Sequence, residues 1–217
     1  MKNLILLLIS LFMITPIQKP KRIVFFGDSI TEMGTQTNGY ISLLKAKANA
    51  QVFEFIGAGI GGDKVYDLYL RLENDVLKHQ PDIVFIYVGI NDVWHKSDFG
   101  TGTDLDKFEK FYRAIIRKIQ AQGAQVICVT PTFIGEKWDA SNPQDGDLNA
   151  YAKTIKKIAK STESGLVDLR TIFLEYSRTH NPENLEKGIL TTDRVHLNET
   201  GNQLVAEAFL EALQNHK

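Results

Sequence analysis

Short apolar runs alternate along the chain with longer segments of helical periodicity. The runs are almost continuously apolar and rich in Val, Ile and Phe, which is typical of strands covered on both faces. They lie at residues 22–27, 52–57, 82–89 and 125–131, with a shorter fifth candidate at 165–169.

The segments between these runs carry apolar residues three and four positions apart, which predicts helices with one buried face. These segments are residues 40–49, 64–80, 104–123, 146–164 and 198–215. Alternation of strands and helices predicts one parallel sheet with helices on both faces. In such α/β sheets a ligand binds at the carboxyl ends of the strands.

Composition narrows the class of protein. The chain has 217 residues, 43% of them hydrophobic and 24% charged, which suits one globular domain with a sizeable core. A net charge of −1 argues against a nucleic-acid partner or binding to an anionic membrane. The single cysteine, Cys128, excludes an intrachain disulfide and a cysteine-rich metal site, and its apolar surroundings predict a buried side chain.

The amino terminus has the pattern of an export signal. Lys2 precedes an apolar run from Leu4 to Ile14, which is too short to span a membrane comfortably and resembles a signal-peptide core. We therefore expect residues 1–21 to be a signal peptide of an exported (periplasmic or secreted) protein, and 22–217 to form the folded domain. No A-x-A cleavage site is present, so an uncleaved membrane anchor is the alternative.

Chemically capable residues follow the predicted strands. Ser29 follows the first, Gly62 the second and Asn91 the third, while Asp193 and His196 precede the last helix. Each has an ordinary explanation alone: Ser29 and Glu32 make a capping box, Asn91 suits an Asx turn, and His196 suits a loop. Because parallel strands end at one edge of the sheet, their convergence predicts a shared site.

The glycine-rich stretch needs separate consideration. Gly57, Gly59 and Gly62 match the dinucleotide-binding pattern between a strand and a helix. However, they follow the second strand, the next strand has no terminal acid for a ribose, and Asp63 stands where a phosphate-binding loop has lysine. A nucleotide cofactor is therefore not expected.

Taken together, four ordered blocks make the chain resemble the SGNH/GDSL hydrolase superfamily of esterases and lipases. The blocks are Gly27-Asp28-Ser29-Ile30, Gly62, Gly89-Ile90-Asn91-Asp92, and Asp193-x-x-His196. One departure is Leu197, where many members have proline. The resemblance implies a three-layer α/β/α sandwich around a five-stranded parallel sheet, the flavodoxin-like SGNH hydrolase fold.

The resemblance also implies the catalytic roles. Ser29 would be the nucleophile, His196 its general base, and Asp193 the acid that orients the imidazole. The oxyanion donors would be the backbone N–H groups of Ser29 and Gly62 and the side-chain amide of Asn91. These roles agree with the chemistry of the residue types, because a serine hydroxyl needs a neighbouring base and an oxyanion needs donors. No metal or other cofactor is required.

The sequence indicates the substrate less closely than the catalytic residues. The segment 131–147 follows the fourth strand and is expected to overhang the site. Candidate substrate-binding residues are Asp28, Trp94, His95, Phe133 and Trp138, with loop packing as the alternative for the aromatic ones. We expect an acetylesterase acting on acetylated carbohydrate. The alternatives are a lysophospholipase- or thioesterase-type acyl hydrolase and a catalytically idle glycan-binding module, and the oligomeric state is left open.

Overall fold

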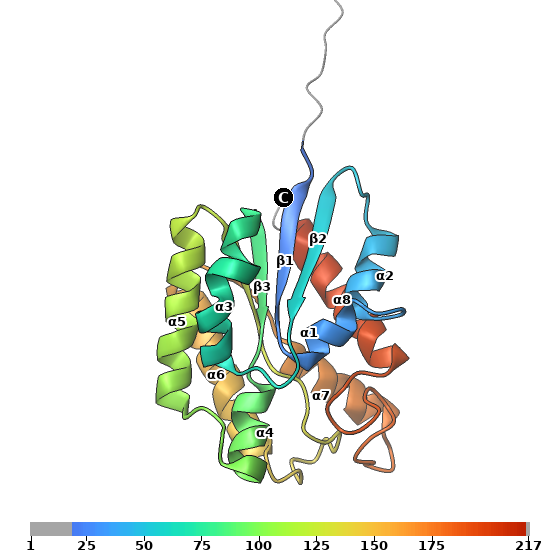
Figure 1. Cartoon of the computed structure of the whole chain (residues 1–217). Coiled ribbons are helices and arrows are strands. Elements are labelled where there is room, and N and C mark those ends of the chain that lie inside the picture. The colour runs from blue at the N-terminus through green and yellow to red at the C-terminus, as the bar shows by residue number, and fades with distance from the viewer. Residues whose placement is uncertain (1–18, 216–217) are drawn as a thin grey trace, which may run out of the picture.

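The computed structural model describes residues 19–215, which form a five-stranded parallel sheet between two layers of helices (Figure 1). The strands are β1 (Lys21–Gly27), β2 (Phe53–Gly59), β3 (Ile83–Tyr87), β4 (Gln125–Val129) and β5 (Gly165–Val167). Their order in the sheet is β2-β1-β3-β4-β5, and every neighbouring pair is parallel. The predicted fold class is confirmed.

The helices divide between the two faces of the sheet (Figure 1). On one side lie α3 (Val65–Asp75), α5 (Leu105–Ala121) and α6 (Asp145–Ser161). On the other lie α1 (Ser29–Gly34), α2 (Tyr40–Lys47) and α8 (Glu199–Asn215). The helices α4 (Ile90–Phe99) and α7 (Leu169–His180) follow β3 and β5, and a short 3₁₀ turn, Leu77–His79, follows α3.

Several boundaries differ from the predicted ones. The fifth strand ends at Val167, and Asp168 caps α7 by accepting a hydrogen bond from the Thr171 amide. The helices α1, α4 and α7 were not predicted as separate elements, and the predicted helix 64–80 stops at Asp75. The strand β2 runs on to Gly59, so its glycines belong to the sheet rather than to a loop.

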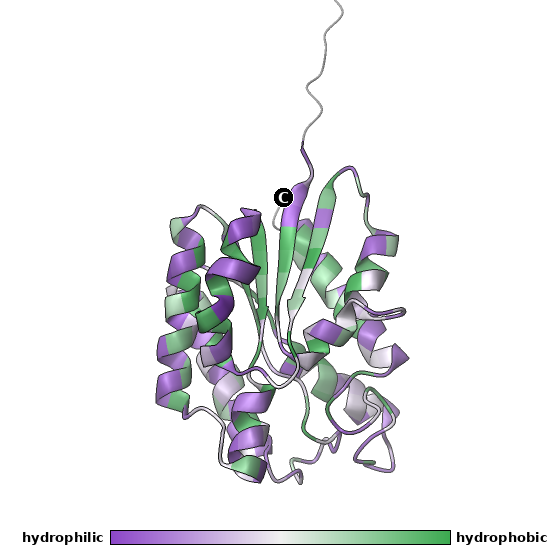
Figure 2. Cartoon of the chain, in the orientation of Figure 1, coloured by the Kyte–Doolittle hydropathy of each residue, from purple (hydrophilic) through white to green (hydrophobic). Residues whose placement is uncertain are grey.

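The core is formed by the strands and the inner faces of the helices, while the outer helix faces are hydrophilic (Figure 2). Phe209 of α8 stacks on Phe25 of β1 and Phe85 of β3, with ring centroids 5.9 and 4.6 Å apart. Cys128 is fully buried in β4, as predicted, and burial raises the pKa of its thiol to about 12. This packing fixes the positions of the strand ends, which the predicted site residues Ser29, Gly62 and Asn91 follow.

The amino-terminal prediction lies mostly outside the described residues. Residues 1–18 of the expected signal peptide or anchor are not among them, and β1 begins at Lys21. Within residues 19–215 no helix is long and apolar enough to cross a bilayer.

Candidate active site

Ser29, His196 and Asp193 form a chain of hydrogen bonds at the carboxyl end of the sheet. Ser29 Oγ lies 3.0 Å from His196 Nε2, and His196 Nδ1 lies 2.7 Å from Asp193 Oδ2. Because a carboxylate can only accept, Nδ1 carries the hydrogen of the neutral ring. Nε2 is then free to accept the hydroxyl hydrogen of Ser29.

The Asp193–His196 turn holds both residues through its own backbone. The second carboxylate oxygen, Asp193 Oδ1, accepts the amide hydrogens of Val195 (3.1 Å) and His196 (2.8 Å). Partial burial raises the pKa of Asp193, but the hydrogen bonds from the His196 ring and from these two amides outweigh it and leave the pKa below its usual range. Asp193 therefore stays ionised beside the imidazole at neutral pH.

Ser29 is the first residue of α1 but not its cap. The predicted capping box is wrong, because the N-cap is Asp28, whose Oδ1 accepts the Ile30 amide hydrogen at 3.0 Å. Asp28 is 2% exposed, and burial raises its pKa to about 7. Its carboxyl group is buried and caps α1, so the prediction that Asp28 binds substrate is not supported. Ser29 itself is half-buried, facing His196.

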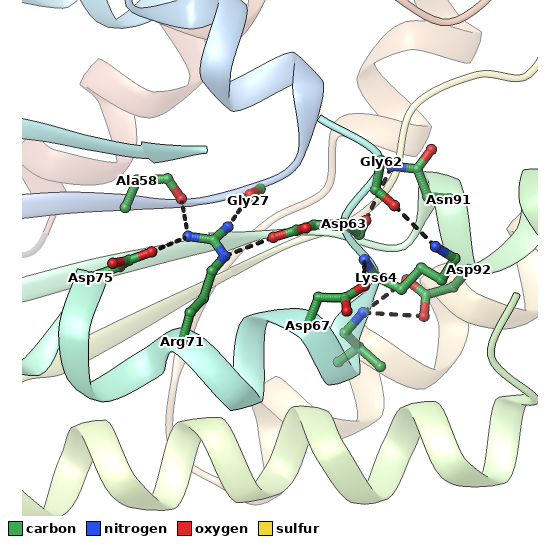
Figure 3. A network of polar contacts seen from close by, with 11 residues as sticks. Gly27, Ala58, Gly62, Asp63, Lys64, Asp67, Arg71, Asp75, Asn91 and Asp92 are labelled. Carbon is green, nitrogen blue, oxygen red and sulfur yellow. Dashed lines mark hydrogen bonds and ion pairs between the residues drawn. The ribbon is translucent and has the colours of Figure 1, made fainter. Parts of the chain in front are cut away.

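Two further donors lie at the neighbouring strand ends. Gly62 has a φ of +81°, a left-handed conformation that a side chain would strain. Asn91, 3% exposed in the first turn of α4, donates from Nδ2 to the Asp63 carbonyl at 3.0 Å (Figure 3). Because a carbonyl can only accept, this contact fixes the orientation of the amide and leaves the second Nδ2 hydrogen available.

The acid after Asn91 has a structural function. Both carboxylate oxygens of Asp92 accept the Val65 amide hydrogen, at 3.2 and 3.3 Å, at the first turn of α3. Burial raises the pKa of Asp92 to about 7. Asp92 thus joins the start of α3 to the start of α4, the two helices that flank Gly62 and Asn91.

A family model described as the GDSL-like lipase/acylhydrolase family matches residues 25–204. The chain belongs to this family. The predicted membership of the SGNH/GDSL superfamily is therefore confirmed, and it supports an esterase activity for this chain.

Individual relatives of this GDSL-family chain are acetylxylan esterases. One from Geobacillus stearothermophilus is 30% identical over 212 residues, covering 89% of this chain and 94% of its own. A crystal structure of the acetyl xylan esterase AlAXEase is 54% identical, with a TM-score of 0.87, and the match covers 88% of this chain and 99% of that one. The structure of Axe2, an acetylxylan esterase from Geobacillus stearothermophilus, is 29% identical with a TM-score of 0.79, covering 92% and 96%.

The aromatic residues predicted to bind substrate in this GDSL-family chain divide into two groups. Trp94 and His95 are half-buried on α4, and a Cβ at position 62 would lie 3.9 Å from His95 Cε1. Phe133, by contrast, is fully buried against Phe173, which fits packing, the alternative given for the aromatic residues, rather than contact with substrate. Trp138 donates its indole N–H to the Asn181 carbonyl, which fits loop packing, the alternative given for it.

Two residues that support the site were not predicted. Arg71 of α3 binds backbone and side-chain groups around Gly62, and buried Glu136 binds the loop that leads to Asp193. Glu136 belongs to no local motif, because its partners at 189–191 are distant in sequence. For Arg71, local spacing allows the pair with Asp75 but gives no sign of the contact with the Gly27 carbonyl, 44 positions away. Among residues 19–215 no group of three or more His, Cys, Asp or Glu side chains is arranged to hold a metal ion.

Proposed function

We propose that this chain is a serine acetylesterase that removes acetyl groups from carbohydrate through an acyl-enzyme. The observation that carries the proposal is the chain of two hydrogen bonds, between Ser29 Oγ and His196 Nε2 and between His196 Nδ1 and Asp193. A serine hydroxyl is a weak nucleophile until a base in hydrogen-bond contact removes its proton.

In the first half-reaction Ser29 Oγ attacks the ester carbonyl while its proton passes to His196 Nε2. The tetrahedral intermediate collapses as the imidazolium protonates the leaving alcohol, and Ser29 is left acetylated. In the second half-reaction water attacks the acetyl carbonyl while His196 takes its proton. The second tetrahedral intermediate collapses as its bond to Ser29 Oγ breaks, His196 returns the proton to Oγ, and acetic acid leaves. Asp193, ionised throughout, stabilises the imidazolium and fixes its orientation.

The negative charge of each intermediate needs donors. The backbone N–H groups of Ser29 and Gly62 and the second Nδ2 hydrogen of Asn91 are suited to this role. Ser29 lies in the first turn of α1, where amides have no acceptor within the helix and the helix dipole favours an anion. Gly62 offers its amide without a side chain in the way.

The carbohydrate part of the proposal is supported by two relatives that are acetylxylan esterases and that align with most of this chain. Solved variants of Axe2 include catalytic mutants in which a serine or a histidine is replaced by alanine. On this chain, His95 of α4 lies near Gly62, and its ring neighbours those of Trp94 and Phe99, with Phe99 65% exposed. Such rings can stack against the apolar face of a sugar.

The decisive experiment is Ser29→Ala. Turnover of a short-chain aryl acetate should be lost with the unfolding temperature unchanged, and labelling by a fluorophosphonate should disappear. The matched control is Ser42→Ala on α2, a serine whose hydroxyl binds the Thr35 carbonyl away from His196. Persistent activity in Ser29→Ala, or no labelling of the unmodified protein, would contradict the proposal; the second result would favour an idle binding module.

The substrate class is tested by measuring acetate released from acetylated xylan and acetylated xylo-oligosaccharides. The same preparation is assayed on aryl esters of increasing acyl length and on lysophospholipid. We expect release of acetate from the glycans and falling rates with acyl length. Cleavage of the longer acyl or phospholipid substrates without release of glycan acetate would favour the lipid acyl hydrolase alternative.

We also infer that residues 1–21 direct export. The supporting observation is the apolar run after Lys2 in the sequence. Mass spectrometry of the protein recovered from an expressing cell checks this: a shortened amino terminus near residue 21 in the exported fraction is expected, and an intact one in the membrane fraction would indicate an anchor.

A further inference from the structure

The guanidinium of Arg71 joins the ends of two strands to the turn that contains Gly62 (Figure 3). Its side chain is 13% exposed and extends from α3. It donates to four oxygens: Asp63 Oδ2 (2.6 Å), Gly27 O (2.7 Å), Ala58 O (3.0 Å) and Asp75 Oδ2 (3.0 Å). The group also lies 4.6 Å from the centroid of the Phe26 ring, so its plane is held by packing as well as by hydrogen bonds.

Two of these oxygens belong to residues within two positions of a proposed oxyanion donor. Gly27 is the last residue of β1, two positions before Ser29, and its carbonyl also accepts the Ile60 amide at 3.3 Å. Asp63 directly follows Gly62, and its own carbonyl accepts from Asn91 Nδ2. A single side chain therefore contacts the backbone before Ser29 and the residue that connects Gly62 with Asn91.

We propose that Arg71 is a positioning residue that fixes the spacing between Ser29 and the other two oxyanion donors, Gly62 and Asn91. This inference rests on the proposed function, because it assigns Arg71 a role in the same oxyanion hole. Arg71 itself does not reach the substrate. It acts through the Gly27 carbonyl on one side and through Asp63 on the other.

The physical basis is preorganisation. Oxyanion donors stabilise the transition state only if they already point at the developing charge, so small displacements are costly. A misplacement of about 1 Å caused by a remote change can lower the rate roughly 10²-fold. The planar guanidinium makes several hydrogen bonds in fixed directions, whereas an ammonium group is a point charge on a flexible stem. Lysine at position 71 would keep the charge but not these directions.

The test is Arg71→Lys, compared with Arg113→Lys as the matched control. Arg113 on α5 pairs with Glu109, an acid four positions away, as Arg71 pairs with Asp75. It also donates to Ser161 on another helix, and neither of its partners belongs to the proposed site. We expect Arg71→Lys to lower kcat for an aryl acetate by about 10–10²-fold with KM within about twofold. Arg113→Lys should leave both constants unchanged.

A double variant tests the route of the effect. Asn91→Ala alone should lower kcat by roughly 10²–10³-fold, the loss typical of one oxyanion donor. Because Arg71 is proposed to place both Gly62 and Asn91, Arg71→Lys should lower kcat by a smaller factor in the Asn91→Ala background than in the wild type. Independent, fully multiplying losses would overturn the proposal, because a general effect on packing predicts them.

Other outcomes are also decisive. A folded Arg71→Lys protein with wild-type kcat overturns the positioning role while leaving the proposed function intact, provided that Ser29→Ala is inactive. Should Arg71→Lys not fold, Asp63→Ser replaces it, since it removes one partner of Arg71 in a half-buried turn but keeps the carbonyl that binds Asn91. A kcat lowered at constant KM is then expected, and an unchanged kcat overturns the proposal.

Discussion

At the scale of single residues, Asp28 links the site to the stability of the fold. Its carboxyl group is buried, caps α1 and has a pKa raised to about 7 from 3.8. Between about pH 4 and pH 7 the unfolded chain therefore releases this proton while the folded protein keeps it. The folded state is penalised as the pH rises through this window, by up to about 4 kcal/mol at 1.4 kcal/mol per pKa unit.

Asp28→Asn should remove this penalty. Asparagine caps helices about as well as aspartate and cannot ionise. We expect the free energy of unfolding of the variant, relative to the wild type, to increase between pH 5 and pH 8. Urea denaturation followed by circular dichroism at the two pH values measures it. A difference that is the same at both pH values would show that the buried carboxyl group does not titrate in this range.

The residues of the candidate site were predictable to the extent that their position follows from local sequence. Ser29, Gly62 and Asn91 follow parallel strands that end at one edge of the sheet, and a three-residue spacing brings Asp193 to His196. The burial of Asp28 and Phe133 was not predictable, because it depends on segments distant in sequence. The same holds for the contact of Arg71 with the Gly27 carbonyl, 44 positions away.

At the scale of elements, packing explains why the glycines in and after β2 have the spacing of a dinucleotide-binding motif. Gly59 lies against the backbone of α1: a Cβ there would be 2.1 Å from the Glu32 nitrogen and 2.7 Å from the Asp28 carbonyl oxygen. The dinucleotide-like spacing thus reflects close packing of a helix on a strand, and that helix carries Ser29.

Gly59→Ala should push α1 away from β2. We expect it to lower the free energy of unfolding by about 1–3 kcal/mol, as overpacking does, and to lower kcat because Ser29 moves with the helix. The control is Gly61→Ala, whose Cβ would meet only the end of the Glu32 side chain at 3.1 Å and Ser29 Cβ at 3.9 Å. Equal stability of the two variants, measured by urea denaturation, would contradict this account of the packing.

The helices were predictable where one apolar face runs over several turns, as in α5 and α6. The short α1 and α4 have no such run, because they follow strand ends and are set by their caps, Asp28 and Gly89. For α7, the apolar positions 169, 172, 173 and 176 have helical spacing, but the preceding strand is only three residues long and its boundary was placed too late.

At the scale of the whole molecule, the site depends on a contact between two long loops. Glu136, in the loop after β4, is fully buried and its carboxylate accepts the amides of Ile189 (2.8 Å) and Leu190 (3.0 Å) and the amide and hydroxyl of Thr191. The Thr191 hydroxyl oxygen in turn accepts the Arg194 amide at 3.2 Å. This network connects the loop after β4 to the turn that contains Asp193 and His196.

Glu136→Gln should loosen this loop without unfolding the sheet. Glutamine has the same shape, but its amide nitrogen would face an N–H group where an acceptor is needed. Hydrogen bonds to a charged group contribute about 1.5–3 kcal/mol, so amides 189–191 should exchange roughly ten- to a hundredfold faster, while those of β1 and β3 keep their protection. We expect kcat to fall because His196 is held less firmly against Ser29.

Glu186→Gln serves as the control for this last prediction. Glu186 lies in the loop that contains residues 189–191. Its carboxylate pairs with Arg194 at the surface, where both side chains are about 40% exposed or more. Exposed pairs of this kind contribute little, so exchange and kcat should stay close to those of the wild type. If Glu136→Gln instead accelerated exchange throughout the sheet, Glu136 would support the global fold. Unchanged exchange at 189–191 would mean that the loop is held by its other contacts.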